Sequence, residues 1–237
     1  MLLLLAMPLH AMPLHAQWRQ RAPQPHNVAY DGRFTFARIR YTELYSAGWS
    51  YDYPEMEQNF MTLLHEITTL SPHVRRSNIL TFDDPELLKF PIAYVSEPGY
   101  WVPSEAEAEG LRRYVEKGGF VIFDDFMGRE WENFETQLRR ALPNARIVPL
   151  DLSHPIFDCF FHIKSLDIPY PGRPYIRAKF FGVHEDNDPS KRLAVVINYD
   201  TDLGDYMEWT GRGWYPVDPT NEAYKLAVNY IVYGMTR

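Results

Sequence analysis

The segment from Pro91 to Asp125 constrains the fold of this chain more than any other part of the sequence. A short apolar run at residues 92–95 ends in a turn and is typical of a buried strand. Residues 104–118 begin with an N-cap serine and end with a glycine, which indicates a helix. A second apolar run, residues 120–123, ends at Asp124-Asp125. This order predicts a βαβ unit, hence a parallel sheet with ligand chemistry where its strands end.

The rest of the chain continues the alternation of strands and helices, so the fold class is α/β. The strands expected at 177–183 and 193–199 flank a polar loop and form a β-hairpin in the C-terminal third. Together these segments predict one domain over residues 33–237. Further strands are expected at 34–41, 79–82 and 146–150, and further helices at 54–70, 131–142 and 221–235.

The composition limits the partners of such a domain. Of 237 residues 46% are hydrophobic, which is enough to build one sizeable core. The net charge is −7, with 24 Lys and Arg against 31 Asp and Glu, and no basic face is visible. Nucleic acid is therefore not an expected partner, because binding to phosphates requires a basic surface. The single cysteine excludes an intramolecular disulfide.

The first sixteen residues have the character of a leader. Four leucines follow Met1, no residue in 1–16 is charged, and the segment ends in a small residue, Ala16. This pattern predicts a signal peptide over residues 1–16, despite the absence of a basic start, and hence a periplasmic or extracellular protein. The alternative is a disordered cytosolic leader. Residues 17–32, which contain two prolines, are expected to form a flexible tether.

Several motifs occur in one order along the chain: Arg38–Tyr41, Trp49–Pro54, Leu111–Gly119 running into Asp124-Asp125, and Ser153–Ile156. Together they resemble the uncharacterised bacterial family called domain of unknown function 4159, over nearly all of the chain after Arg33. That resemblance implies a class I glutamine amidotransferase-like fold, a three-layer flavodoxin-like sandwich around a mostly parallel sheet. It also implies export or attachment to membrane proteins, and no settled activity.

The amidotransferase resemblance provides a test for glutaminase chemistry. In that fold a nucleophilic cysteine occupies the turn after the strand that corresponds to residues 120–123. Here the turn begins with Asp124-Asp125, and Cys159 lies elsewhere without a following His-x-Glu pair. We therefore expect a glutaminase-incompetent domain in which Cys159 is a small structural side chain.

Acidic residues follow several of the predicted strands. Because the carboxyl ends of parallel strands meet at one edge of a sheet, their side chains are expected to line one crevice. Clustered carboxylates bind divalent cations, or act as general acid and base when their pKa values are separated. The structural alternative is that aspartate caps helices and fits turns. The candidate ligand-binding residues are Glu97, Asp124, Asp125, Trp49, Asp52, Asp200 and Asp202, with Asp124, Asp125 and Asp202 as candidate metal ligands; Asp205 belongs to the same acidic segment.

Three weaker patterns are more simply structural. His154, Asp158 and His162 are spaced four residues apart, which on a helix would align metal ligands, but Pro155 disfavours a continuous helix. The aromatic residues around Trp49 would suit either a sugar-stacking surface or a lid on the core. The acidic run 185–188 is expected to be a solvated hairpin tip.

Three classes of function are compatible with these features. The first is a non-catalytic ligand-binding or scaffolding module in the cell envelope, which the missing nucleophile favours. The second is a carboxylate- or metal-dependent hydrolase of an envelope glycan that uses Asp124 or Asp125. The third is an accessory subunit of a membrane complex. The sequence identifies no cofactor; a divalent cation is the candidate, and a glycan or an envelope or membrane protein is the candidate partner.

Overall fold

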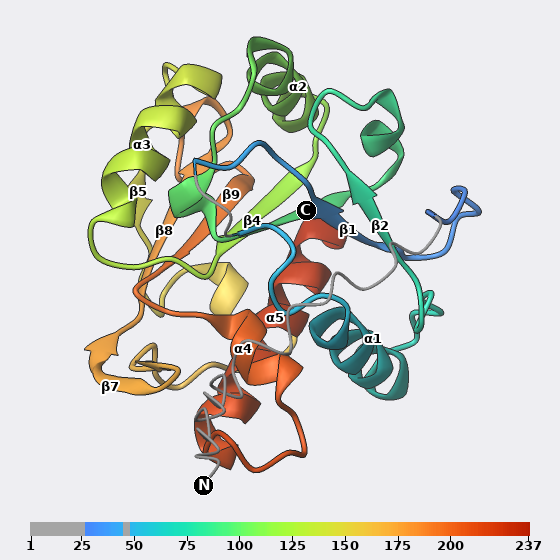
Figure 1. The fold of residues 1–237 in the computed structure, drawn as a ribbon, viewed down its shortest axis with the longest axis vertical. Coiled ribbons are helices and arrows are strands. Elements are labelled where there is room, and N and C mark those ends of the chain that lie inside the picture. Colours follow the sequence, from blue (N-terminus) through green and yellow to red (C-terminus); the bar gives the residue numbers. More distant parts are fainter. Residues whose placement is uncertain (1–26, 45–47) are drawn as a thin grey trace, which may run out of the picture.

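The computed structural model describes residues 27–44 and 48–237 of the chain, and Figure 1 shows its fold. Strands and helices alternate, as the sequence predicts. The strands are β1 (Phe36–Ile39), β2 (Ser77–Leu80), β3 (Ile92–Ser96), β4 (Phe120–Asp124), β5 (Val148–Pro149), β6 (Pro169–Tyr170), β7 (Arg173–Arg177), β8 (Lys179–His184) and β9 (Leu193–Tyr199). The helices are α1 (Glu55–Ile67), α2 (Glu105–Glu116), α3 (Glu130–Ala141), α4 (Leu203–Glu208) and α5 (Val217–Thr236).

The central sheet has seven strands in the order β2-β1-β3-β4-β9-β8-β5. The first five of these are parallel to one another, and they reproduce the 2-1-3-4-5 order of flavodoxin-like folds. β8 pairs antiparallel with β9, which confirms the predicted C-terminal hairpin, and β5 pairs antiparallel with β8. The prediction of a mostly parallel α/β sheet is therefore confirmed.

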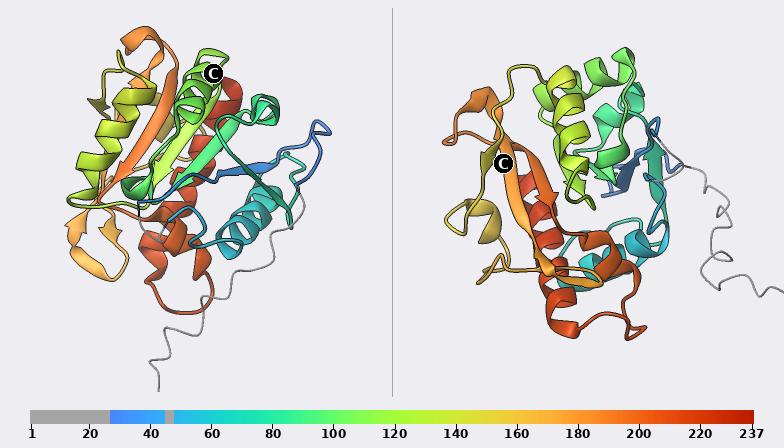
Figure 2. Two further views of the ribbon diagram at one scale, coloured as in Figure 1. Left: turned by 45° about the horizontal axis from the view of Figure 1, so that its top comes forward. Right: turned by 60° about the vertical axis from the view of Figure 1, so that its left-hand side comes forward.

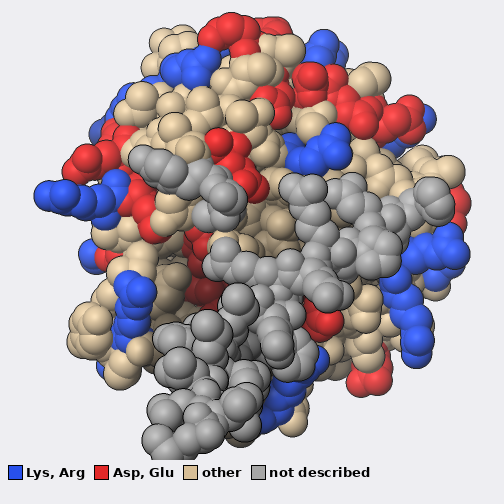
Figure 3. All heavy atoms as spheres, in the orientation of Figure 1, with Lys and Arg blue, Asp and Glu red and all other residues tan. Residues whose placement is uncertain are grey.

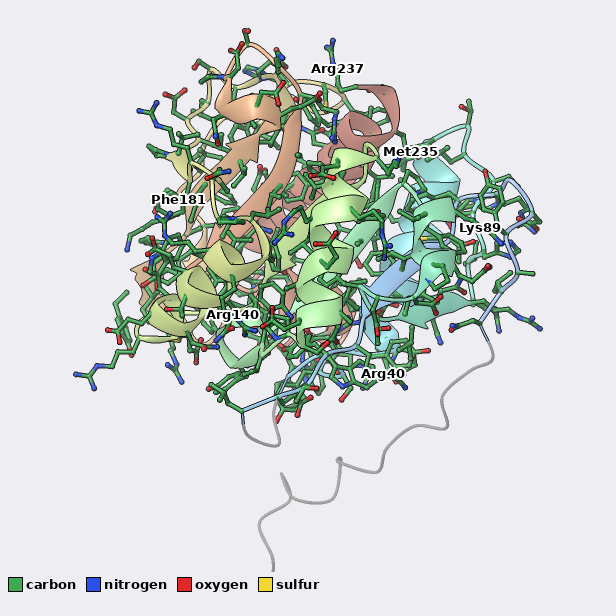
Figure 4. The ribbon with its side chains drawn as sticks, turned by 90° about the horizontal axis from the view of Figure 1, so that it is seen from above. Arg40, Lys89, Arg140, Phe181, Met235 and Arg237 are labelled. Atoms are coloured by element: carbon green, nitrogen blue, oxygen red, sulfur yellow. The ribbon has the colours of Figure 1, made fainter. Side chains whose placement is uncertain are left out.

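Helices cover both faces of the sheet and complete three layers (Figure 2). Successive residues of a strand point to opposite faces, so β4 contributes to both cores. Ile122 packs with the helices α1, α4 and α5, whereas Phe123 packs with α2 and α3. α2 and α3 lie side by side in Figure 4, where Arg140 of α3 is labelled, and Arg112 of α2 donates to the carbonyl of Ala141 at 2.9 Å.

Local sequence signals set the ends of α2 as predicted. Ser104 accepts a hydrogen bond from the backbone N–H of Glu107, and the Glu107 carboxylate accepts one from the N–H of Ser104. This capping box satisfies two donors that the first helical turn leaves free. Gly118 follows the helix with a φ of 97°, a left-handed conformation that glycine adopts without strain.

Four features differ from the sequence expectations. The short helix α4 was not expected, the predicted strand at 146–150 is reduced to two residues, and a small β6–β7 hairpin occupies the proline-rich section. Residues 27–31 do not form a tether, because Asn27 exchanges hydrogen bonds with the backbone of Ile79 in β2. The predicted signal peptide and residues 17–26 lie outside the described residues. Within the described ranges, no helix combines the length and apolarity needed to cross a bilayer.

Candidate functional site

The loops that follow four adjacent parallel strands meet at the carboxyl edge of the sheet. Each loop carries an acidic residue: Asp52 follows β1, Glu97 follows β3, Asp125 follows β4 and Asp202 follows β9. In a 2-1-3-4-5 sheet, the crevice lies where the connections on either side of the first strand diverge, between β1 and β3. The topology therefore brings these acids to the place where flavodoxin-like folds bind their ligands.

Three of these side chains form a compact group, which we call the acidic centre. Carboxylate oxygens of Asp52, Asp125 and Asp202 all lie within 4.8 Å of one another. Asp125 and Asp202 are buried, at 4% and 5% exposure, while Asp52 is half-buried. Figure 3 shows Asp and Glu atoms at depth near the centre of this face, close to where Figure 1 places α4.

The side chains of the acidic centre accept few hydrogen bonds, and those to Asp125 are long. Asp125 accepts from the hydroxyls of Ser96 and Tyr170, each at 3.3 Å. Asp202 accepts from the backbone N–H of Asp205 at 2.7 Å and so caps α4. The Oδ2 atom of Asp52 is completely buried and has no hydrogen-bond partner among the described residues.

The Oδ2 atom of Asp52 lies over the backbone at the start of α4. A Cβ atom at Gly204 would be 2.5 Å from it and 3.4 Å from Oδ1 of Asp202. Only glycine leaves room for a carboxylate here, because a Cβ contact below 3.0 Å forces a displacement. Gly204 therefore allows the loop after β1 and the loop after β9 to approach each other.

Burial and mutual repulsion make the acidic centre electrostatically unfavourable without a bound cation. Burial raises the pKa of Asp52, Asp125 and Asp202 well above the usual range, and neighbouring carboxylates raise it further. Glu97 lies nearby, and burial followed by the charges of Glu130 and Glu43 raises its pKa to about 8. Each of these carboxyl groups must therefore be protonated or lie beside a positively charged group.

The buried guanidinium of Arg38 relieves only part of this repulsion. Its positive charge lowers the pKa of Asp52, but its Nε atom donates to Glu57 at 2.5 Å. It also donates to the carbonyls of Trp49 and Tyr51, at 2.8 and 2.9 Å. Arg38 therefore holds the loop that carries Asp52, while its own charge is matched by Glu57.

Asp124 faces away from its neighbour Asp125, into the layer that contains α4 and α5. It accepts hydrogen bonds from the Tyr94 hydroxyl, the Asn198 amide and the backbone N–H groups of Leu203 and Gly204, at 2.9 to 3.1 Å. Burial raises its pKa to about 6, and these hydrogen bonds oppose that rise. The expectation that Asp124 and Asp125 line one wall therefore does not match this geometry: Asp124 anchors the start of α4.

Two other sequence candidates also lie outside the acidic centre. Asp200 pairs with Lys179 at 2.6 Å and accepts from the backbone N–H of Gly128. The Trp49 side chain packs against the core formed with α2 and α3. Both side chains therefore have structural contacts that account for their positions.

Four acids in the loops after β1, β3, β4 and β9, with Asp200 rather than Asp202 in the last loop, share an unusual backbone conformation. The φ angles of Asp52, Glu97, Asp125 and Asp200 are 62°, 51°, 66° and 56°. This left-handed region is uncommon for residues other than glycine, and asparagine and aspartate enter it most readily. At Glu97, Asp125 and Asp200 it turns the chain directly after a strand, whereas Asp52 lies just before α1.

A second acidic group adjoins the first and shares Asp52 with it. Carboxylate oxygens of Asp52, Asp205 and Glu208 also lie within 4.8 Å of one another. Glu208 is not among the residues that the sequence pattern predicts, and Asp205 is predicted only as part of the acidic segment. A signal was present, because residues 202, 205 and 208 recur every three residues, which places them near one another on a short helix.

The remaining sequence candidates are separate from this edge. His154 faces His184 across 3.2 Å between their Nε2 atoms, whereas the exposed His162 contacts Asp158. The spacing 154-158-162 therefore forms no metal site on a helix. The half-buried thiol of Cys159 donates to the carbonyl of Asn229, and burial raises its pKa.

Comparisons with known proteins agree with the resemblance seen in the sequence motifs. A family model described as "Domain of unknown function (DUF4159)" matches residues 35–235, which is most of the chain. A comparison with curated proteins found no match. The chain therefore belongs to the DUF4159 family, and the acidic centre lies inside the matched region.

Proposed function

We propose that this chain is an exported, amidotransferase-like ligand-binding module of the cell envelope. Its acidic centre would hold a divalent cation and, through that cation, an oxygen-rich ligand such as an envelope glycan. One observation carries this proposal: the carboxylates of Asp52, Asp125 and Asp202 converge within 4.8 Å from three separate loops.

The chemistry of the three side chains favours a hard cation. Calcium and magnesium bind carboxylate oxygens, and both leave coordination positions to water or ligand when the protein supplies only a few. The buried, unpartnered Oδ2 atom of Asp52 is costly as it stands. A bound cation would compensate it, and the vacant positions would accept the hydroxyls of a polyol.

The position of Asp125 supports the amidotransferase-like assignment together with the loss of glutaminase activity. Asp125 follows β4 directly and has a positive φ, as expected for the sharp turn that carries the nucleophile in that fold. A carboxylate there replaces the thiolate that glutaminase chemistry requires. The four hydrogen bonds of Asp124 likewise disfavour its use as a general acid or base, so binding is favoured over carboxylate hydrolysis.

Export rests on the uncharged, leucine-rich sequence of residues 1–16. Cleavage after Ala16 is the expected processing step. N-terminal sequencing of the protein from its native host tests it, and a chain that retains Met1 would contradict export by this signal.

Calorimetric titration of the chelator-treated chain with Ca²⁺, Mg²⁺ and Mn²⁺ tests the binding proposal. At least one cation is expected to bind to the wild-type protein, and Asp125→Asn and Asp202→Asn are each expected to lose the cation held by the acidic centre. Asp200→Asn is the matched control for Asp125→Asn: it changes the same chemical group in the same left-handed conformation, outside the acidic centre. A panel of envelope glycans, titrated with and without the cation, then tests for the ligand.

Absence of cation binding to a folded wild-type chain would overturn the proposal. A number of bound cations that is unchanged in both Asp125→Asn and Asp202→Asn would place the site elsewhere and overturn it as well. Turnover of a bound glycan would replace the binding role by the hydrolytic one.

A further inference from the structure

We infer that this edge of the sheet holds two divalent cations, bridged by the carboxylate of Asp52. The first is the cation of the proposed function, on which this inference rests. The second would be held by Asp205 and Glu208 of α4 together with Asp52. Carboxylate oxygens of these three residues lie within 4.8 Å of one another, as those of the acidic centre do.

α4 presents the two additional ligands in a fixed arrangement. Asp205 and Glu208 are three residues apart on this helix and so lie on neighbouring positions of one face. The Asn59 amide of α1 donates to the carbonyls of Met207 and Glu208, at 2.8 and 3.1 Å, which ties the end of α4 to α1. The second group is therefore built on anchored secondary structure.

Asp205 is oriented by the segment that follows α4. Its Oδ2 atom accepts from the Tyr215 hydroxyl at 2.8 Å, and its Oδ1 atom accepts from the Trp209 indole at 3.3 Å. Hydrogen bonds of this kind orient carboxylates that ligate metals. Each oxygen has a second lone pair, so these contacts leave Asp205 able to bind a cation.

The bridging role of Asp52 rests on an observation that is independent of the acidic clustering. Its buried Oδ2 atom has no hydrogen-bond partner among the described residues, although the side chain belongs to both acidic groups. A carboxylate between two cations uses both oxygens as ligands, which would satisfy this atom. The neighbouring guanidinium of Arg38 is already paired with Glu57.

Charge balance also favours two cations over one. The two groups together contain five different carboxylates. One divalent cation would leave a formal charge of about −3 in a partly buried site, whereas two would leave about −1. Two cations bridged by a carboxylate also form the arrangement that stabilises attacking and leaving oxygens in hydrolytic enzymes. The ligand class would then extend to anionic oxygens such as phosphate or carboxylate groups.

Manganese is the probe that distinguishes one cation from two. The chelator-treated full chain is titrated with Mn²⁺, the bound metal is counted by equilibrium dialysis, and its electron paramagnetic resonance spectrum is recorded. We expect two Mn²⁺ ions per chain with a spin-coupled spectrum. Glu208→Gln is expected to lose one ion and the coupling, and Asp52→Asn is expected to lose both ions.

A matched control separates ligation from general charge. Glu55 is exposed on α1, and its charge also acts on Glu208. Glu55→Gln removes one negative charge near the same group and is expected to keep two coupled ions. Thermal melting of each variant verifies that it is folded.

The outcomes of this experiment separate the two proposals. One uncoupled ion in the wild type, unchanged in Glu208→Gln, would overturn the second site and leave the proposed function standing. No bound ion in the folded wild type would overturn both. Equal losses in Glu55→Gln and Glu208→Gln would also overturn the second site, because charge alone would then explain them.

Discussion

The two ends of the central sheet bury titratable groups in opposite ways. At the carboxyl edge, the carboxylates of Asp52, Asp125 and Asp202 are all hydrogen-bond acceptors, and their negative charges repel one another. At the amino edge, where the end of β8 meets the start of β9, His154 and His184 form a complementary pair. The first arrangement is relieved by protonation or by a nearby positive charge, whereas the second is satisfied by hydrogen bonds within the described residues.

The histidine pair is complete because its tautomers are determined by the backbone. The N–H of Ile156 donates to Nδ1 of His154, so the neutral ring carries its proton on Nε2. That Nε2–H then donates to Nε2 of His184, 3.2 Å away. Ionised carboxylates cannot form such a pair, because neither of them has a proton to donate. A buried group that contains both donors and acceptors can therefore satisfy itself, while a group of acceptors alone needs protons or a positive charge.

The largest expected effect comes from removing the buried positive charge of Arg38 at the acidic edge. Arg38→Met leaves Glu57 buried without its partner and releases the carbonyls that hold the loop of Asp52. Breaking a buried ion pair on one side costs about 3–5 kcal/mol. Urea unfolding at pH 7 measures this loss.

The exposed pair between Lys89 and Glu86 provides the control for that experiment. Lys89→Met is expected to change the free energy of unfolding by less than about 1 kcal/mol. An equally small effect of Arg38→Met would show that the Arg38–Glu57 pair does not stabilise this edge.

The next largest effect on stability distinguishes two adjacent carboxylates, those of Asp124 and Asp125. Asp124→Asn disturbs a carboxylate with four hydrogen-bond donors and is expected to cost about 1–3 kcal/mol. Asp125→Asn removes a repelling charge and is expected to leave the cation-free protein equally stable or slightly more stable. Unfolding in the presence of a chelator measures both variants, and equal losses would contradict the distinction between a structural and a ligand-binding carboxylate.

The pH dependence of stability is expected to have opposite signs at the two edges. Burial, and then the charge of His184, lowers the pKa of His154 to about 4. The ordinary value near 6.5 applies to the unfolded chain. The unfolded chain therefore binds more protons, so this contribution is present above pH 6.5 and is lost as the pH falls towards about 4. Asp151 and Asp188 face the pair and oppose this change.

The acidic edge behaves in the opposite way when no cation is bound. Burial, followed by neighbouring carboxylates, raises the pKa of Glu208 to about 7 and that of Glu97 to about 8. Their contribution is present below about pH 4.5 and is lost as the pH rises towards about 8.

Chelator-treated wild type and a His154→Gln/His184→Gln variant, unfolded between pH 4 and 8, separate the two contributions. We expect the variant to lose about 1 kcal/mol of pH dependence below pH 6.5, a value reduced because the pair is partly solvated. An unchanged profile below pH 6.5 would contradict the assignment to the histidines.

The smallest effect concerns the thiol near the amino edge. Cys159→Ala removes a half-buried side chain that donates to Asn229, and it is expected to cost about 1 kcal/mol. Cation binding at the opposite edge is expected to remain unchanged, as measured by calorimetry. Glutamine-dependent ammonia release that disappears in this variant would contradict the absence of glutaminase chemistry.

The sequence was sufficient to predict the sheet because its signals are local. The apolar runs before Asp125, the capping serine of α2 and the polar loop before β9 each determine an element from a few neighbouring residues. The helix α4 gave no comparable signal, since six residues are too few for an amphipathic period. Its helical form depends on Asp124 and Asp202, which receive its first N–H groups.

The site was predictable only in part. The rule that strands end at one edge correctly brings Asp52, Asp125 and Asp202 together. It cannot tell that Asp124, one residue earlier, points into the opposite layer and is fully hydrogen-bonded. That distinction depends on the register, which pairs Asp124 with Ser96, and on donors far away in the sequence.

The left-handed residues in the loops that follow the parallel strands have a consequence for experiments that select among random substitutions. At Asp52, Asp125 and Asp200 the backbone accepts aspartate, asparagine or glycine with little strain and disfavours most other residues. A saturation library sorted only for folded protein is therefore expected to return these three residues at each position. A second sort for cation binding is expected to restore aspartate alone at positions 52 and 125, and to leave position 200 as mixed as before. Because these positions share one backbone conformation, the comparison of the two sorts separates the requirement for a residue that fits a left-handed backbone from the requirement for a negative charge.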